Sequence, residues 1–361
     1  MKVAQALLPV PILATFKMRH RQECLHHLQN RFAEPTKETC SMRTTRTEPQ
    51  NLPEMTLALA PARRNPGPSW GYRFLRAADI LLPECIYKPL RAAGTFIAML
   101  LMPAQRRHSR AYLALVLPRA PAWRDTFRHF FAFEEMLMAK LRLINGAPPR
   151  AIYAPSCPGD IKHWLDNGGA ALIGSFHIGV SDLQGFQLGA TEKHTIHVVR
   201  ERVGNSHDTD KLGEKFGARL RFIWVNDPGA MIFTLKDAAD DPAASIALKC
   251  DRIEQRARTA AFEFLGARRL FPVTIYLLAA IFKRPVMLCF GIPAGPRAAT
   301  VYSSPRLDIA PGESRESVLA RGHEHFQNFL RVVETQLRAH PYQWFNFLPM
   351  NPPEPAANIS T

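Results

Sequence analysis

Residues 170–182 read Ala-Ala-Leu-Ile-Gly-Ser-Phe-His-Ile-Gly-Val-Ser-Asp, and this stretch joins an apolar run to a turn with polar side chains. The run at 170–176 is almost continuously apolar, which is typical of a strand buried on both faces. After Gly179 the apolar residues recur with the period of a helix. His177 therefore stands where a buried strand gives way to a helix. Open α/β sheets place their chemistry at that edge.

Asp182 follows His177 by five residues, close enough for its carboxylate to reach back to the imidazole. Such a contact holds one tautomer of the histidine and stabilises the imidazolium, so the pair predicts a general base. About one pair with this spacing is expected by chance from 13 histidines and 31 acidic residues in 361. The other such pair, His129 and Glu134, lies in a run with helical period, where positions five apart are about 140° apart around the axis. We therefore interpret His129 as structural.

The His-x4-Asp pattern after an apolar strand resembles the lysophospholipid/lipid A acyltransferase superfamily, in particular its late lipid A acyltransferase-like branch. The similarity covers about residues 70–350. The resemblance implies a fold like that of glycerolipid acyltransferases. It also implies that a fatty acyl chain passes from an acyl thioester to a hydroxyl or amine of a lipid-like acceptor, with His177 as general base oriented by Asp182. Four further segments carry it: 199–205 (VRERVGN), 249–252 (KCDR), 262–267 (FEFLGA) and 340–347 (HPYQWFNF).

One segment departs from the glycerophosphate branch of that superfamily. Where that branch has Phe-Pro-Glu-Gly-Thr, residues 271–274 read Phe-Pro-Val-Thr, so a lysophosphatidate acceptor is not expected. The lipid A-like branch has a Phe-Leu-Gly element instead, matched here by residues 264–266. Gly266 permits a close approach of the backbone, either to substrate or between elements, and it is a candidate substrate-binding residue.

Four charged residues are the other candidates for substrate binding. Arg200 and Arg202 end the predicted strand at 195–200, and alternate strand positions share a face, so both guanidinium groups can approach one phosphate or carboxylate. The alternative is a solvated strand end paired with Glu201 or Asp208. Asp251 and Arg252 follow the apolar run at 246–248 in the same way, and a purely structural ion pair is the alternative there.

The central part of the chain alternates strand and helix patterns. This alternation predicts an α/β fold with a mostly parallel central sheet and helices on both faces. Residues 151–350 form the predicted acyltransferase domain, and 351–361 a tail. Strands are expected at 170–176, 195–200, 219–225, 245–248 and 285–290, and helices at 106–143, 180–188, 207–216, 228–238, 274–282 and 314–339.

The N-terminal third differs in composition from the rest. Residues 1–68 are rich in Arg, Thr, Glu and Pro and are expected to be disordered; Met55 is a second plausible start, so residues 1–54 are open to being a misannotated extension. Residues 69–150 are predicted to be helical. Within them, 70–102 mixes apolar and aromatic residues with Arg73, Arg76, Lys88 and Arg91. We predict a membrane-interfacial segment with its basic side chains toward anionic headgroups; core helices are the alternative.

The formal net charge of +15 predicts attraction to an anionic partner. The expected partners are membrane lipids and either acyl carrier protein or acyl-coenzyme A, the co-substrate, with no other cofactor. Nucleic acid is not expected, because the basic residues are dispersed without an aromatic-basic module. Six cysteines without paired or metal-type spacing suit a reducing compartment and indicate no metal site. We therefore expect a peripheral or monotopic position on the cytoplasmic face of the inner membrane.

Other chemistries find little support in the sequence. It has no Gly-x-Ser-x-Gly elbow, P-loop, Gly-x-Gly-x-x-Gly after a strand or His-Glu-x-x-His motif. Ser175 and Ser181 lie near His177 as conceivable nucleophiles of a hydrolase, but no elbow exposes either. The remaining alternative is a non-catalytic basic scaffold, binding membrane or nucleic acid, that retains the acyltransferase fold.

Overall fold

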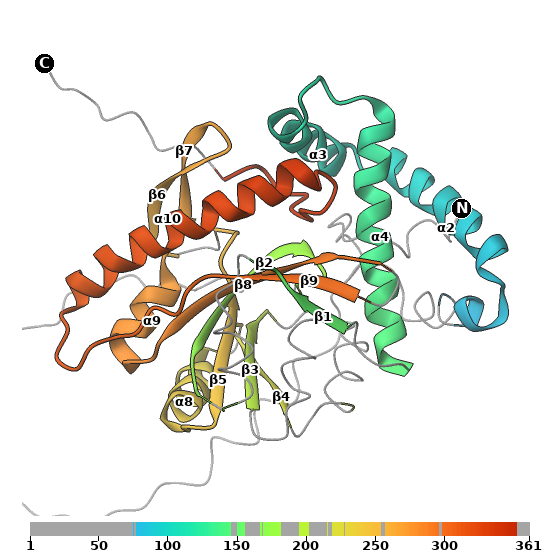
Figure 1. The fold of residues 1–361 in the computed structure, drawn as a ribbon. Coiled ribbons are helices and arrows are strands. Elements are labelled where there is room, and N and C mark those ends of the chain that lie inside the picture. Colours follow the sequence, from blue (N-terminus) through green and yellow to red (C-terminus); the bar gives the residue numbers. More distant parts are fainter. Residues whose placement is uncertain are drawn as a thin grey trace, which may run out of the picture. The chain divides into compact units, whose positions relative to one another are not determined.

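A computed structural model describes residues 75, 77–145, 150–155, 167, 169–181, 195–201, 215, 219–226, 228–253, 257–295 and 298–351. Three helices come first, and strands interspersed with three further helices follow among the described residues (Figure 1). The helices are α2 (Glu84–Leu101), α3 (Pro103–Val116), α4 (Trp123–Asn145), α8 (Pro228–Asp240), α9 (Thr274–Phe282) and α10 (Arg315–Ala339). The strands are β1 (Arg150–Tyr153), β2 (Leu172–Gly179), β3 (Thr195–Arg200), β4 (Leu220–Trp224), β5 (Ala244–Lys249), β6 (Thr259–Phe264), β7 (Ala267–Pro272), β8 (Val286–Pro293) and β9 (Ala298–Ser303).

Seven strands form one sheet in the order β1-β9-β8-β2-β5-β3-β4. Every pair in it is parallel except β8 with β9. The α/β class and the mostly parallel sheet are therefore confirmed. Strands β6 and β7 form a separate antiparallel hairpin. In the central sheet, β2, β5 and β3 are consecutive neighbours, so their carboxyl ends share one edge.

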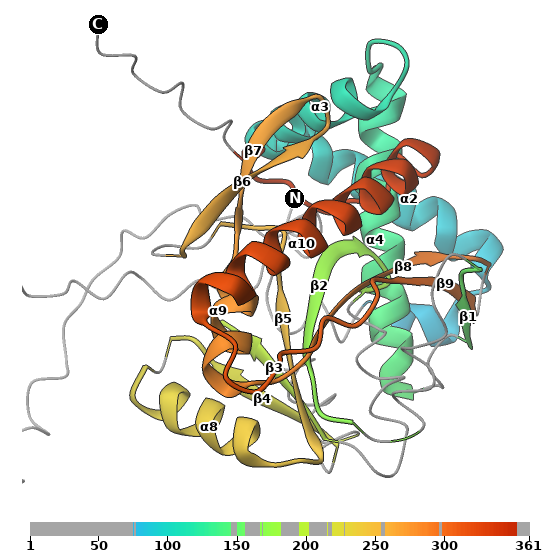
Figure 2. The ribbon, with the colours of Figure 1, turned by 60° about the vertical axis from the view of Figure 1, so that its left-hand side comes forward.

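The apolar runs are explained by burial on both faces of the sheet. In β8, Leu288 and Phe290 join a core cluster with side chains of α8, α9 and α10, whereas Met287 and Cys289 join a second cluster with Leu143 of α4. Figure 2 shows α10 running across the strands. Alternate positions of a strand point to opposite faces, so both must be apolar when helices cover both faces.

Most predicted strands and helices are confirmed within a few residues. The expected strands match β2, β3, β4, β5 and β8, and the helices expected at 228–238, 274–282 and 314–339 match α8, α9 and α10. Strands β1 and β9 and the hairpin were not predicted. The helices expected at 180–188 and 207–216 lie almost entirely outside the described residues, as do residues 1–68 and the tail beyond Asn351.

The prediction that residues 106–143 are helical throughout is wrong at 117–122, where the chain leaves helical conformation between α3 and α4. Pro118 and Pro121 fall in this gap. Proline lacks the N–H that a helix interior needs, and it disfavours helical geometry in the residue before it. Pro103 is tolerated because it occupies the first position of α3, where no N–H is required.

No helix among the described residues is by itself long and apolar enough to cross a bilayer. Helices α2 and α3 are long and apolar enough for a membrane span only when taken together, and the chain bends by 98° between them.

Candidate active site

The carboxyl end of β2 leaves the regular sheet just before His177. Pairing with β5 and β8 is regular as far as Ser175, and the register against β8 shifts between Ser175 and Gly179. The backbone then bonds to a segment after α10 that we call the strap, residues 343–351. The N–H of Gly179 donates to the carbonyl of Gln343 (2.7 Å), and the N–H of Phe345 donates to the carbonyl of His177 (2.8 Å).

Asp251 holds His177 from the neighbouring strand. It directly follows Cys250 at the carboxyl end of β5, and its side chain is 1% exposed. Oδ1 lies 2.8 Å from Nδ1 of His177, and Oδ2 accepts the backbone N–H of His177 at 2.8 Å. Oδ2 also accepts the indole N–H of Trp344, at 2.8 Å. Three donors thus meet one buried carboxylate, which fixes its orientation.

Electrostatics favour a neutral imidazole beside an ionised carboxylate. Burial lowers the pKa of His177 below its usual value, and the attraction of Asp251 offsets only part of this. Burial alone would raise the pKa of the Asp251 carboxyl, but His177, Arg252 and Lys249 together hold it below the usual range. The proton of the neutral imidazole therefore lies on Nδ1, donated to Asp251. That leaves the lone pair of Nε2 to accept a proton.

The His177 imidazole is also partly exposed. The His177 side chain is 25% exposed, and no described residue forms a hydrogen bond with Nε2. A neutral, partly exposed histidine with a carboxylate on Nδ1 has the arrangement of a general base.

Asp182, the carboxylate predicted to orient His177, lies outside the described residues. That assignment stays a prediction, whereas Asp251, predicted to contact substrate, occupies the orienting position at Nδ1. Asp251 and His177 each follow a buried apolar run, and this shared feature was the available signal. The sequence does not show that the two runs are neighbours, whereas in the structure β2 and β5 pair in parallel and bring the ends of both runs together.

The other predicted site residues are only partly brought together. Arg252 donates from Nη2 to the carbonyl of Phe345 (2.7 Å), so it anchors the strap next to the His177 segment. Arg200 ends β3, on the far side of β5 from β2, with its guanidinium 5.5 Å from the centre of the Phe222 ring. Arg202 lies outside the described residues. Substrate binding by these arginines stays a prediction.

Gly266 occupies the turn of the β6–β7 hairpin. Its φ is +76°, preceded by +49° at Leu265, so glycine is favoured there by backbone conformation. A Cβ at Gly266 would meet no atom within 4 Å. A close approach between elements therefore does not explain this glycine, and contact with substrate stays a prediction.

Three described side chains close to His177 along β2 and β5 are poor candidates for a covalent nucleophile. The hydroxyl of Ser181 donates to the carbonyl of Ile178 and accepts the N–H of Gly291. Ser175 points to the carbonyl of Leu248 at 3.5 Å. Burial raises the pKa of the Cys250 thiol well above its usual range, which disfavours the reactive thiolate.

His129 belongs to the core, as expected, and supports the strap. Its Nε2 lies 2.8 Å from the carbonyl oxygen of Trp344 and must donate to it, so Nδ1 accepts the hydroxyl of Ser109 at 2.8 Å. Glu134 pairs instead with the buried Arg91. The two members of this second His-x4-Glu pair therefore act separately.

Burial lowers the pKa of His129 to about 4, which predicts a pH-dependent stability. An unfolded histidine binds its proton near pH 6.5, so between there and about pH 4 the unfolded state binds more protons and the folded state loses stability as pH falls. The loss is on the order of 3 kcal/mol. Urea unfolding at several pH values should show a steeper decline for wild type than for His129→Gln. Parallel declines would contradict this assignment.

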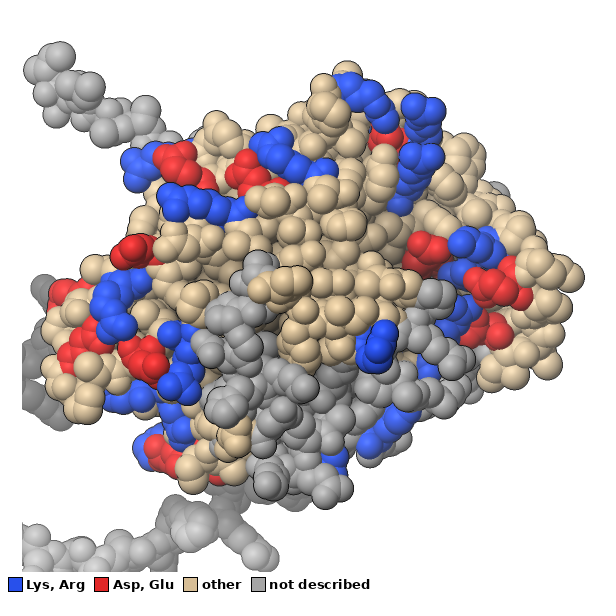
Figure 3. Space-filling view, in the orientation of Figure 1, with Lys and Arg blue, Asp and Glu red and all other residues tan. Residues whose placement is uncertain are grey.

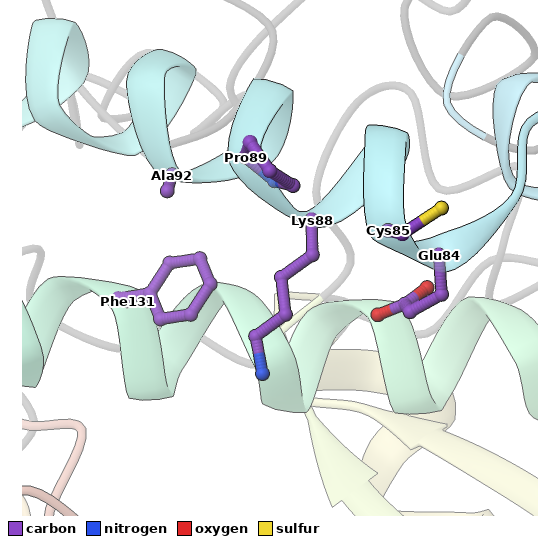
Figure 4. Close-up of a pocket in the computed structure, with 6 residues that line it drawn as sticks. All are labelled: Glu84, Cys85, Lys88, Pro89, Ala92 and Phe131. Carbon is purple, nitrogen blue, oxygen red and sulfur yellow. The ribbon is translucent and has the colours of Figure 1, made fainter.

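A shallow hollow of about 420 Å³ between α2 and α4 lies among residues that were predicted to face a membrane (Figure 4). Lys88 lies over the Phe131 ring and forms an ion pair with Glu135 at 3.4 Å. Arg91 is buried and bonded to Glu134 and Glu84. The prediction that Arg91 points to headgroups is therefore wrong, because two glutamates bind it inside the helical layer. Arg73 and Arg76 lie outside the described residues.

Among the described residues, no group of three or more His, Cys, Asp or Glu side chains is placed to hold a metal ion. Comparison of the sequence with protein-family models and with curated proteins finds no match.

Proposed function

We propose that this protein is an acyltransferase that moves a fatty acyl chain from an acyl thioester, carried by acyl carrier protein or coenzyme A, to a hydroxyl or amine of a lipid-like acceptor. The observation that carries the proposal is the buried Asp251 carboxylate on Nδ1 of the partly exposed His177. The resemblance in sequence supplies the reaction class.

In the proposed mechanism, Nε2 of His177 takes the proton of the acceptor as its oxygen or nitrogen attacks the thioester carbonyl. Asp251 stabilises the imidazolium that forms. As the tetrahedral intermediate collapses, the carbon–sulfur bond breaks and the proton passes to the leaving thiolate. No acyl-enzyme forms, in keeping with the engagement of Ser175 and Ser181 in other hydrogen bonds. Arg200 and Arg202 are the proposed contacts for a phosphate of donor or acceptor, and Gly266 a further substrate contact.

Lipid mass spectrometry tests the acyl-transfer proposal. Lipids would be compared from cells that lack the protein, express it, or express His177→Ala. At least one lipid should gain the mass of an acyl chain only with wild type. Identical lipids in all three, with the protein folded and present, would favour the non-catalytic scaffold.

We further propose that α2 docks on an anionic membrane. Its exposed apolar residues Ile86, Leu90, Ile97 and Leu101 recur at helical spacing and are 46–60% exposed. An adjacent face packs on α4 through Tyr87 and Arg91. An exposed face more apolar than the buried one suits a bilayer interface.

A basic rim borders the end of this apolar face. Arg106 lies 5.4 Å from the centre of the Trp123 ring, and that ring lies 6.3 Å from Phe96 of α2. Arg107, Arg110 and Arg124 are exposed nearby in sequence on α3 and α4. Lys and Arg gather in Figure 3 over the end of the molecule where α3 and α4 meet. A cytoplasmic face of the inner membrane remains the proposed location.

Membrane docking predicts separate effects of apolar and basic substitutions. Leu90→Ser with Ile97→Ser should weaken binding to anionic vesicles at every salt concentration, because buried apolar area is lost. Arg107→Gln with Arg110→Gln should weaken it at low salt by about 1 kcal/mol per residue and lessen its salt dependence.

The matched controls lie far along the chain. Ile281→Ser on α9 removes an apolar side chain that is more exposed than either Leu90 or Ile97, and Arg315→Gln with Arg331→Gln removes two charges from α10. Vesicle cosedimentation measures the binding. If the α9 and α10 variants lose as much binding as those of α2 and α3, or if wild type ignores vesicles at low salt, this docking face is wrong.

A further inference from the structure

We propose that Trp344 is a positioning residue for the candidate base: its indole N–H fixes the Asp251 carboxylate, and thereby sets the orientation and basicity of His177. This inference rests on the proposed function and deepens it. It starts from an aromatic residue in the strap, 93 residues along the chain from the carboxylate that it binds.

Asp251 can hold His177 in one orientation only if its own carboxylate cannot rotate. Oδ1 bonds to Nδ1 of His177, whereas Oδ2 receives two donors, the backbone N–H of His177 and the indole N–H of Trp344. Two of these three hydrogen bonds come from His177 itself, the residue that Asp251 holds. Among the described donors to this carboxylate, Trp344 is the one that does not belong to His177; it comes from the strap.

The indole is itself held by the core. Trp344 is 1% exposed, and the rings of Tyr112 and Phe264 meet it edge-on with centroids 5.1 and 5.7 Å away. Its carbonyl accepts the Nε2 proton of His129. Side chains of α3, α4 and β6 thus fix the direction of the N–H, so the carboxylate takes its orientation from the packed interior.

Loss of the N–H has a predictable electrostatic effect. A carboxylate with one donor fewer keeps more negative charge for its remaining partner, and so stabilises the imidazolium of His177 more strongly. The charged groups facing the pair, Arg252 and Lys249, are unchanged by this substitution. The pKa of His177 should rise, which leaves less neutral base at a given pH.

The test is an ¹⁵N NMR titration of histidine-labelled full-length protein, with the His177 signals identified by their absence in His177→Ala. Wild type should show a neutral His177 protonated on Nδ1 near neutral pH. In Trp344→Phe the pKa of His177 should rise. Any measurable acyl transfer should show its acid limb moved to higher pH, with kcat/KM about tenfold lower, since a hydrogen bond to a charged group is lost.

Two comparisons separate the N–H from packing. Phe264→Leu disturbs the packing around the indole but leaves the N–H in place, so it should not move the pKa of His177. Site-specific replacement of Trp344 by 3-benzothienylalanine, which has the same shape with sulfur in place of N–H, should reproduce the effect of Trp344→Phe. The benzothienylalanine variant also provides the test of the N–H if Trp344→Phe does not fold.

An unchanged pKa of His177 in both Trp344 variants, or an equal shift in Phe264→Leu, would overturn the inference. The titration does not require acyl transfer. A shifted pKa in a protein without transferase activity would therefore sustain this positioning role and reject the proposed function, whereas an active enzyme with an unchanged pKa would do the reverse.

Discussion

Replacement of His177 by alanine is expected to lower the rate of acyl transfer by about 10²–10⁴-fold, the usual contribution of a general base. The folded state should persist, because the side chain is partly exposed and its backbone bonds to the strap remain. Thioester consumption in the presence of an acceptor measures the rate, and thermal unfolding checks the fold.

The control for this substitution is a histidine away from the sheet edge. His323→Ala on α10 removes an exposed imidazole whose described contacts are a hydrogen bond to the carbonyl of Ala261 and a stack on Phe262, and it should retain most activity. His129→Ala is a poor control, because this buried side chain supports the carbonyl of Trp344 and its removal would leave a cavity. Equal losses in His177→Ala and His323→Ala would remove His177 from the mechanism.

Asp251→Asn should be about as damaging, on the order of 10³–10⁴-fold in kcat. The neutral amide offers a donor NH₂ beside Nδ1, which favours the tautomer protonated on Nε2, and that tautomer cannot accept a proton from the acceptor. The amide also loses the charge that stabilises the imidazolium. The rate would be measured with thermal unfolding alongside, because a change at a buried carboxylate with three donors also costs stability.

Asp182→Asn is the comparison that separates the two carboxylates. The sequence pattern predicts a loss nearly equal to that of His177→Ala, whereas the geometry gives the Nδ1 position to Asp251. An active Asp251→Asn beside an inactive Asp182→Asn would show that Asp182 orients the base and that the bond to Asp251 is structural.

The elements with strong local patterns were predictable from the sequence. Residues 170–176 and 285–290 are apolar on both faces, which is typical of a strand between covering helices, as β2 and β8 are. In the helix expected at 314–339, Ser314 caps α10 by accepting the N–H of Ser317. The edge strand β1 lacks such a signal, because its partner β9 lies far along the chain.

The candidate site was predictable only in part, for the same reason. His177 was found because a polar residue ends an apolar run, but its carboxylate comes from β5 and the donor behind that carboxylate from the strap. Strand order and the path of the strap are properties of the whole fold. The partner of Arg91 was likewise not predictable from the sequence, since Glu134 contacts it from a different helix.

The most direct test of the central claim follows the acyl group itself. Purified protein would be incubated with a deuterated acyl thioester and a total lipid extract, and protein and lipids would be analysed by mass spectrometry. A direct transfer through His177 predicts deuterium in a lipid, none retained on the protein, and at least about 10²-fold less transfer by His177→Ala. Label that remains on the thioester, accumulates as free fatty acid, or reaches lipid equally with His177→Ala would contradict it.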